Sequence, residues 1–279
     1  MEKSVSFSTD ELLPHSSVNQ EAETTVLLIH GACVDRDDWD LVIPHLKNYH
    51  LLVPDQIGHG EARHIRPYTL DNAASTIAQL IKQRGHDGVA HVVGHSLGAS
   101  VALRLAAKHP EVVSSMVVSG VCKLERTRFT PYLPYAVWVS QRVENVVPRA
   151  VTRWLMDGAD IGNADLSLCT LDFNKQIFGE SLSSGEWPGA WAARTLVIAA
   201  TKKGILPTDD NVEVAKTVAE IGRRLDSETI AVAHSGMRHP WNRQDPKLFA
   251  DVIKAWVEGT AVLPAGFQRL TTESSVSTI

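Results

Sequence analysis

The chain has 279 residues, of which 44% are hydrophobic, and it carries a formal net charge of −5. A chain of this length can bury one large core unaided, and Cys33, Cys122 and Cys169 show no CxxC spacing, which argues against a zinc site and a disulfide framework. The acidic balance, without a basic stripe, argues against a nucleic-acid partner.

The two ends of the chain are more polar than its centre. Residues 1–22 contain no apolar run of signal-peptide length, and no later segment approaches the ~20 apolar residues that span a membrane. Together with the cysteine pattern, this predicts a cytoplasmic protein without a membrane span. Residues 261–279 are expected to form a flexible tail.

From residue 25 onward, apolar runs of strand length alternate with helical patterns. Residues 25–29 and 50–54 predict buried strands that end in glycine-rich loops. The next segment predicts a helix with Thr69 as its N-cap and Gly85 at its end. This alternation is typical of βα units around a mostly parallel sheet.

The centre of the chain predicts a strand, a sharp turn and a helix. The strand covers residues 89–93, and the helix begins at Ser96 and ends before Pro110. Three further central strands are predicted, at residues 116–120, 195–200 and 229–234.

Residues 123–192 interrupt this alternation. They hold most of the aromatic residues of the chain, in short helical patterns broken by prolines. We interpret them as an inserted helical cap on an α/β core formed by residues 23–122 and 193–260.

The segment from Gly94 to Gly98 reads G-H-S-L-G and matches the G-x-S-x-G motif. It lies between an apolar strand and a helix, where the glycines permit a sharp turn that exposes a serine hydroxyl. The motif therefore predicts Ser96 as a nucleophile and the Leu97 N–H as a donor to the developing oxyanion.

With two further motifs, at residues 30–32 (HGA) and 55–60 (DQIGHG), the chain resembles the α/β-hydrolase superfamily, in particular its small soluble esterase-like members, over residues 25–258. The resemblance implies the α/β-hydrolase fold, a mostly parallel central sheet flanked by helices. It also implies that the Ala32 N–H is a second oxyanion donor, and that Asp55 and His59 have structural roles in their turn.

The general base is expected after the last predicted strand. Residues 235–241 (SGMRHPW) resemble the G-x-x-H loop of the family, which points to His239. A neutral imidazole can accept the serine proton near neutral pH and return it to the leaving group. His234 lies within the predicted strand and is more typical of a packed histidine.

The acid of a catalytic triad is not evident. The family places it after the strand at 195–200 in a G-x-x-D-x-x-x-P pattern, where this chain has Lys203, and a cation cannot stabilise an imidazolium. The candidate carboxylates are Asp210, with Asp209 as the alternative, and then Glu125 and Asp172. Thr208 predicts a helix N-cap, after which acids commonly interact only with the helix dipole. A serine–histidine dyad stays open.

The resulting hypothesis is hydrolysis of a carboxylic ester or lactone of an apolar small molecule through an acyl-enzyme, with neither metal nor cofactor. Cys33, Trp138 and Trp154 are the predicted substrate contacts; Cys33 lacks the basic neighbour of a nucleophile. Two alternatives stay open. Lys203 gives some support to a non-hydrolytic enzyme of the same fold, such as a C–C lyase or cyclase, and the missing acid gives some to a ligand-binding receptor.

Overall fold

The computed structural model describes residues 12–124, 126–161, 165–181, 186–204, 210–260 and 262–271. Glu125, Thr208 and Asp209, which the sequence analysis considered, lie outside the described residues. Of the candidate acids, Asp210 and Asp172 are among the described residues.

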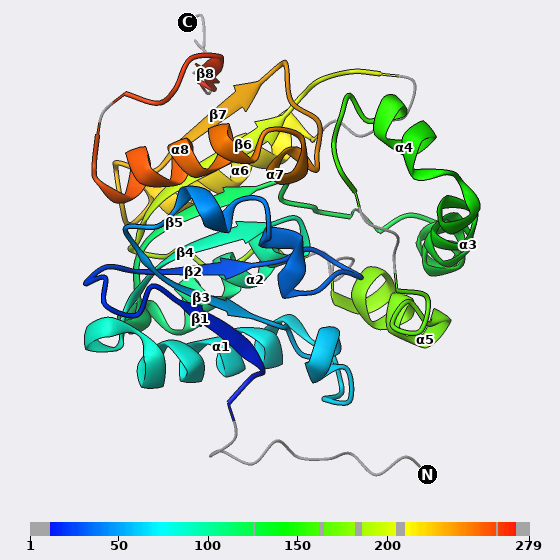
Figure 1. Ribbon diagram of the computed structural model, residues 1–279, viewed down its shortest axis with the longest axis horizontal. Helices are drawn as coiled ribbons and strands as arrows, with labels where there is room; N and C mark the ends of the chain where they lie inside the picture. The colour runs from blue at the N-terminus through cyan, green and yellow to red at the C-terminus, as the bar shows by residue number, and fades with distance from the viewer. Residues whose placement is uncertain are drawn as a thin grey trace, which may run out of the picture.

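An eight-stranded sheet runs through the molecule in the order β1-β3-β2-β4-β5-β6-β7-β8 (Figure 1). Its strands are β1 (His15–Val18), β2 (Thr25–Ile29), β3 (His50–Pro54), β4 (Ala90–His95), β5 (Val113–Ser119), β6 (Arg194–Ala200), β7 (Ile230–His234) and β8 (Phe267–Arg269). The six strands from β2 to β7 are parallel, and β1 and β8 pair antiparallel at the two edges. The predicted fold class, a mostly parallel sheet with flanking helices, is confirmed.

Helices cover both faces of the sheet and one end of it. They are α1 (Leu70–Arg84), α2 (Leu97–Lys108), α3 (Leu133–Val146), α4 (Arg149–Leu155), α5 (Leu171–Asn174), α6 (Val212–Arg223), α7 (Trp241–Gln244) and α8 (Pro246–Val257). A π-helix, Lys175–Ser181, continues α5. Short 3-10 helices occupy Arg36–Trp39, Ile43–His45, Gly60–Ala62, His86–Gly88, Pro110–Val112 and Thr130–Tyr132.

The sheet separates two hydrophobic cores, because successive side chains of a strand point to opposite faces. Leu27 and Ile29 of β2 pack with α1, α2 and α6, whereas Val26 and Leu28 pack with α8. All these side chains are fully buried, which explains why the central strands read as continuous apolar runs.

Two strands lie where the sequence predicted only polar segments. β1 falls within residues 1–22 and β8 within 261–279, so the N-terminal segment and the expected tail each contribute an edge strand. An edge strand can be held by backbone hydrogen bonds with little apolar burial, and both strands are half-buried or exposed. Their composition therefore does not distinguish them from loops.

The helices α3, α4 and α5 stand apart from the sheet layers, beyond the ends toward which the parallel strands run (Figure 1). They contact the body through buried side chains, including Phe173 of α5, whose ring lies 4.8 Å from that of His59. Within the described part of the chain, no helix combines the length and apolar character needed to cross a bilayer.

Candidate active site

Ser96 occupies a strained turn between β4 and α2. Its backbone has φ +56° and ψ −117°, a region that residues other than glycine rarely adopt. The Ser96 N–H donates to the Ser119 carbonyl at the end of β5 over 2.8 Å, which holds the turn against the neighbouring strand. Strain of this kind persists only where the surrounding structure fixes it, and it is common at functional sites.

The two glycines of the motif are required by close backbone contacts. A Cβ on Gly94 would clash with the carbonyl of Gly98, and a Cβ on Gly98 would clash with the carbonyl of Ile29 at the end of β2. The turn can therefore bring Ser96 beside the loop that follows β2 only if both positions lack side chains.

The loop that follows β2 lies against the serine turn. A Cβ on Gly31 would be 3.4 Å from the Ser96 Cβ, so the residue that precedes Ala32 packs against the serine turn. Leu97 is the first residue of α2, where the N–H groups lack acceptors within the helix and the helix dipole is positive. The two predicted oxyanion donors thus belong to the loop that follows β2 and to the first residue of α2.

A buried histidine fixes the loop that carries Ala32. His30 Nδ1–H donates to the Gly31 carbonyl over 2.8 Å, and the Gln56 N–H donates to His30 Nε2 over 3.1 Å. Burial lowers the pKa of His30, so the ring is neutral and one nitrogen remains an acceptor. The HGA and DQIGHG motifs are therefore in direct contact.

The second motif is itself held by Asp55. The Asp55 Oδ1 and Oδ2 atoms accept the N–H groups of Arg36 and Glu61, each over 2.9 Å. His59 is fully buried, and its Nδ1–H donates to the Ile57 carbonyl over 3.0 Å. Both side chains thus hold their own turn, as the resemblance implied.

His239 and Asp210 form a close pair at the carboxyl ends of β7 and β6. His239 Nδ1 lies 2.6 Å from Asp210 Oδ1, a length typical of a charge-assisted hydrogen bond. The other carboxylate oxygen, Asp210 Oδ2, accepts the Ala200 N–H over 2.8 Å, and the Asp210 N–H donates to the Ala200 carbonyl over 2.8 Å. The carboxylate is therefore fixed on both sides.

The two residues of the pair differ in exposure: the histidine is partly accessible and the carboxylate is buried. This suits a histidine that accepts a proton from a substrate-side group while the carboxylate stabilises it. The Asp210 side chain is 6% exposed and that of His239 is 33% exposed. Burial lowers the pKa of His239, but the hydrogen bond and charge of Asp210, together with the charge of Asp38, raise it by more. The net pKa of His239 lies above its ordinary value.

Neighbouring residues fix the place of His239 relative to the serine turn. His95 Nε2–H donates to the His239 carbonyl over 2.8 Å, and the two rings lie 5.0 Å apart. Burial and the proximity of His239 lower the pKa of His95 to about 4, so His95 is a neutral donor. Gly120, with φ +68°, leaves room for the imidazole, because its Cβ would lie 2.6 Å from His239 Cε1.

The surroundings of Asp210 differ from the sequence expectation. α6 begins at Val212 with Asn211 as its N-cap, so Asp210 precedes the helix and is not an acid of its first turn. Asp172 is exposed on α5 and accepts a hydrogen bond from Gln176 over 2.8 Å. Lys203 is an exposed loop residue. Asp210 is thus the carboxylate that the structure brings to His239.

The predicted substrate contacts have three different environments. Cys33, with φ +62°, is buried, and its Sγ accepts from Gln141 Nε2 over 3.1 Å. Trp138 is half-buried, with the Arg142 guanidinium 3.7 Å above its ring. Trp154 is 73% exposed, which argues against its expected place in a substrate pocket.

Cys33 also interacts with a second thiol. A hydrogen bond from Cys169, and one from Gln141, lower the pKa of the Cys33 thiol by more than burial raises it. Cys169 in turn has a raised pKa, because it donates that hydrogen bond and is buried. Gln141 and Cys169 come from the helical segment, so its contact with the Cys33 loop was not evident from the sequence.

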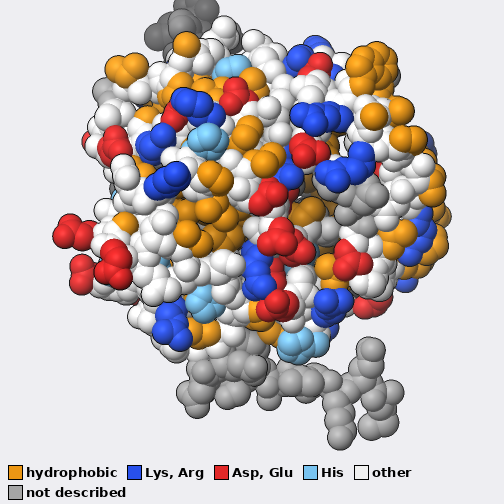
Figure 2. Space-filling model, viewed as in Figure 1, with side chains coloured by type: hydrophobic (Ala, Val, Ile, Leu, Met, Phe, Trp, Pro, Cys, Tyr) orange, Lys and Arg blue, Asp and Glu red, His pale blue; other side chains and the backbone are white. Residues whose placement is uncertain are grey.

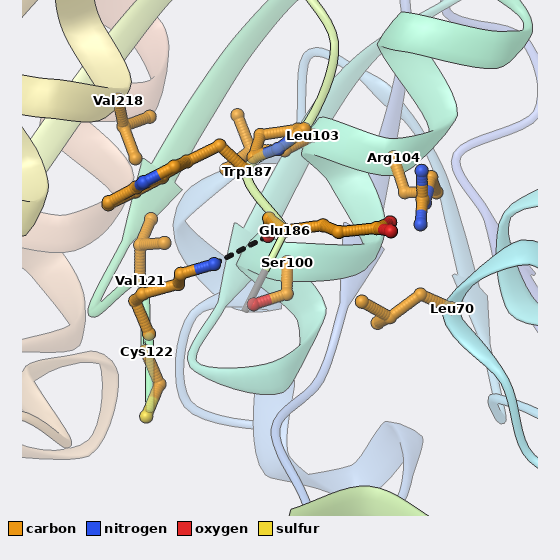
Figure 3. Close-up of a pocket in the computed structure, with 11 residues that line it drawn as sticks. Leu70, Ser100, Leu103, Arg104, Val121, Cys122, Glu186, Trp187 and Val218 are labelled. Carbon is orange, nitrogen blue, oxygen red and sulfur yellow. Dashed lines mark hydrogen bonds between the residues drawn. The ribbon is translucent and has the colours of Figure 1, made fainter. Parts of the chain in front are cut away.

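A pocket lies beside the site but is not lined by its central residues (Figure 3). Its walls are Leu70, Ser100, Leu103, Arg104, Val121, Cys122, Lys123, Glu186, Trp187, Pro188 and Val218. Two of these wall residues are joined by a hydrogen bond, in which Lys123 Nζ donates to the Glu186 carbonyl over 2.6 Å. Within the described ranges, no three His, Cys, Asp or Glu side chains gather as a metal site would require.

A serine at a strand–turn–helix elbow, preceded by a residue that contacts a carboxylate-paired histidine, is consistent with the arrangement of an α/β hydrolase. The sequence matches the model of the Alpha/beta hydrolase family over residues 26–252, and the chain belongs to this family.

Two sequence relatives differ in how much of the chain they cover. An AB hydrolase superfamily protein of Gibberella zeae is 38% identical over 262 residues, 93% of this chain and 88% of its own. Lipase LipV of Mycobacterium tuberculosis is 39% identical over 93 residues, which make up 33% of this chain and 35% of that protein.

Among solved structures, a thermophilic esterase of Thermogutta terrifontis superposes with a TM-score of 0.68. The alignment covers 88% of this chain and 93% of that chain at 18% identity. At this identity the likeness concerns the fold alone.

Proposed function

We propose that the protein is a serine hydrolase that cleaves a carboxylic ester or lactone of an apolar small molecule through an acyl-enzyme on Ser96. The observation that carries the proposal is the His239–Asp210 hydrogen bond of 2.6 Å, in which His239 is held by His95, the residue before the strained turn of Ser96. This pair supplies the base and its supporting acid in the order that nucleophilic catalysis by serine requires.

In the acylation step, Ser96 Oγ attacks the carbonyl carbon while His239 Nε2 takes the serine proton. Asp210 accepts the Nδ1–H of His239, which keeps the proton off Nε2 and stabilises the imidazolium that forms. The imidazolium then donates its proton to the departing alkoxide, and the acyl group remains on Ser96.

In the deacylation step, His239 takes a proton from water, which attacks the acyl-enzyme carbonyl. The acid is released when the proton returns to Ser96 Oγ. In both steps the Ala32 and Leu97 N–H groups hold the negative oxygen, and losing one such donor typically costs about 2.7–4 kcal/mol. The hydrogen bonds of His30 support this arrangement because they fix the loop before the reaction begins.

The substrate class rests on the relatives and on the helical segment. Proteins named lipase and methyl ester esterase share about a third of this chain at 38–39% identity. We assign the predicted cap, residues 123–192, to a place over the site through its helices α3, α4 and α5, and its aromatic residues favour an apolar acyl or alcohol group. The receptor alternative depended on a missing acid, and Asp210 beside His239 removes that reason.

Turnover of a panel of p-nitrophenyl esters by the wild type and by Ser96→Ala tests the proposal. We expect the wild type to hydrolyse at least one ester and Ser96→Ala to lose this activity. Ser100→Ala, one turn later on α2, is the matched control and is expected to keep it. The proposal would be contradicted if Ser96→Ala hydrolysed the esters as fast as the wild type, or if the wild type hydrolysed none of them.

A further inference from the structure

Large hydrophobic side chains gather on the outer surface of the helical segment. Eight of them are 43–80% exposed: Phe129, Tyr132, Tyr135, Val139, Val143, Val146, Val151 and Trp154. We call them the α3–α4 face. In the rest of the described chain, the exposed large hydrophobic residues are Trp187, Leu225 and Val262, which are scattered in sequence. Exposed apolar clusters, unlike scattered residues, mark interaction sites.

The geometry of α3 makes this face a continuous stripe. The residues Tyr132, Tyr135, Val139, Val143 and Val146 are three or four positions apart, and at 3.6 residues per turn they fall within about 80° of arc. Gln141 lies on the opposite side of the helix, where it is buried and donates to Cys33 Sγ over 3.1 Å. The helix therefore turns a polar anchor inward and its apolar stripe outward, the reverse of a helix that packs on a core.

The charge around the face is opposite in sign to that of the protein. Residues 126–155 contain five arginines, one glutamate and no other charged residue, a net charge of +4 in a chain whose net charge is −5. The guanidinium of Arg128 lies 4.7 Å above the ring of Phe129, within the cluster. Figure 2 shows hydrophobic side chains along the edge of the molecule over α3 and α4, with Lys and Arg side chains among them.

We propose that the α3–α4 face docks on the surface of an anionic lipid membrane. Its aromatic rings and valines would enter the boundary between headgroups and acyl chains, and exposed arginines such as Arg128 and Arg153 would contact lipid phosphates. The apolar stripe of α3 resembles the apolar side of an interfacial helix. α3 itself holds one arginine, Arg142, and the other four arginines of residues 126–155 lie before and after this helix in the sequence.

The charge also argues against a second copy of the chain as the occupant. A two-fold dimer through this face would bring the same surface of both subunits together, and hence two segments of net charge +4. Like charges across an interface are unfavourable. An anionic membrane instead pairs with the arginines and covers the apolar stripe at the same time.

This docking does not depend on the chemistry proposed for Ser96, but it would help to supply an apolar substrate. α3 contacts the loop of Cys33 through Gln141, and Ala32 precedes Cys33 in that loop. The docked helix would thus hold the site next to the lipid surface, where apolar esters partition.

Flotation of the full-length protein with vesicles tests the proposal. Vesicles of phosphatidylcholine alone are compared with vesicles of phosphatidylcholine and phosphatidylserine. We expect binding to the mixed vesicles that weakens with salt. The variant Tyr132→Ser/Val139→Ser/Val146→Ser should bind the mixed vesicles at least about tenfold more weakly than the wild type. Leu225→Ser/Val262→Ser, which removes exposed apolar groups elsewhere, should bind as the wild type does.

A charge variant separates the two contributions. Arg128→Gln/Arg153→Gln should weaken binding to the mixed vesicles by about fivefold for each arginine removed. Lys47→Gln/Arg84→Gln, at exposed positions outside the face, is the matched control and should change binding little.

Three results would overturn the proposal. The first is a wild type that binds neither kind of vesicle, and the second is a serine variant of the face that binds as the wild type does. The third is light scattering that shows a wild-type dimer and a monomeric serine variant, because the face would then join two copies of the chain. Since the substituted side chains are exposed, circular dichroism should show all variants folded.

Discussion

Asp210→Asn is the substitution that most directly perturbs the base of the proposed reaction. The carboxylate has two occupied oxygens, one toward His239 Nδ1 and the other toward the Ala200 N–H. Both of these partners are N–H donors. An asparagine amide has one acceptor and one donor end, so it cannot accept a hydrogen bond from both. If its NH₂ group faces His239, Nδ1 must become the acceptor, and the proton moves to Nε2, where it blocks attack by Ser96.

The other orientation is no better. With the amide oxygen toward His239, the NH₂ group faces the Ala200 N–H, and two donors meet in a site where the side chain is 6% exposed. A buried unsatisfied donor costs about 1–3 kcal/mol, so the first orientation, with the wrong tautomer, is favoured. In a serine protease, the same change of acid to amide lowers kcat by about 10⁴-fold. We expect a loss of ~10³–10⁴-fold, or about 4–5.5 kcal/mol of barrier.

The pH dependence of the remaining activity gives a second, independent readout. Acylation requires neutral His239, whose pKa is raised above its ordinary value by Asp210 against the lowering effect of burial. The rising limb of kcat/KM in the wild type should therefore lie at a higher pH than an ordinary histidine gives. In Asp210→Asn the burial effect remains without the negative charge, so the limb should move to lower pH.

The assay is hydrolysis of the best p-nitrophenyl ester, measured as kcat and kcat/KM across the range in which histidine titrates. Asp172→Asn is the matched control. Asp172 is an exposed carboxylate on α5 that accepts a hydrogen bond from Gln176. Near wild-type kcat for Asp210→Asn, or an equal loss for Asp172→Asn, would refute the role assigned to Asp210.

Three further substitutions test the surroundings of the site. Gly120→Ala places a Cβ 2.6 Å from His239 Cε1 at φ +68°. In steady-state kinetics kcat should fall, and in denaturant titration the free energy of unfolding should drop by about 1–3 kcal/mol. Gln141→Leu removes one of the two acceptors of the buried Asn174 NH₂ group and leaves the Thr170 carbonyl as the other, so the free energy of unfolding should drop by about 1–3 kcal/mol. His95 has a folded-state pKa of about 4, below its unfolded value, so its contribution to stability is present above the unfolded pKa and is lost as the pH falls toward 4. His95→Gln should therefore show a shallower loss of unfolding free energy over that range than the wild type.

Each of these has a result that would count against the structural reasoning. Gly120→Ala with wild-type kcat would mean that the imidazole has more room than the close contact allows. Unchanged stability of Gln141→Leu would mean that the buried amide pair contributes nothing. Equal slopes for His95→Gln and the wild type would mean that this histidine does not titrate differently on unfolding.

The central strands and the serine turn could be predicted because their signals are local. Each buried strand is a short apolar run, and the predicted N-cap Thr69 does accept the Asn72 N–H over 3.0 Å. The glycines of the serine motif are needed because the sharp turn between the strand and the helix brings backbone atoms too close for a side chain. The edge strands could not be predicted in this way, because their pairing involves the backbone of polar residues.

The partner of His239 could be ranked but not assigned from the sequence. Asp210 follows β6 by ten positions and reaches His239 because its own backbone returns to Ala200. That return is a tertiary contact, and it shifts the acid away from the usual position, where Lys203 stands. The contact of Gln141 with Cys33 joins residues 108 positions apart, and neither residue belongs to a motif that would announce it.

The orientation of α3 was also beyond the sequence. Helical periodicity gives the stripe of Tyr132, Val139 and Val146, and such a stripe ordinarily predicts the buried side of a helix. In this structure the buried side carries Gln141, because Asn174 and Cys33 satisfy its amide. Periodicity can therefore locate this helix, but it does not establish which of its sides is buried.

The central claim is that His239 activates Ser96, and a fluorophosphonate reagent tests it most directly. The wild type and His239→Ala are treated with the reagent, and the adduct is located by peptide mass spectrometry. We predict one adduct per chain, on Ser96, that forms in the wild type and is lost in His239→Ala. An unmodified Ser96 at concentrations that label another serine esterase, or equal labelling of His239→Ala, would contradict the account.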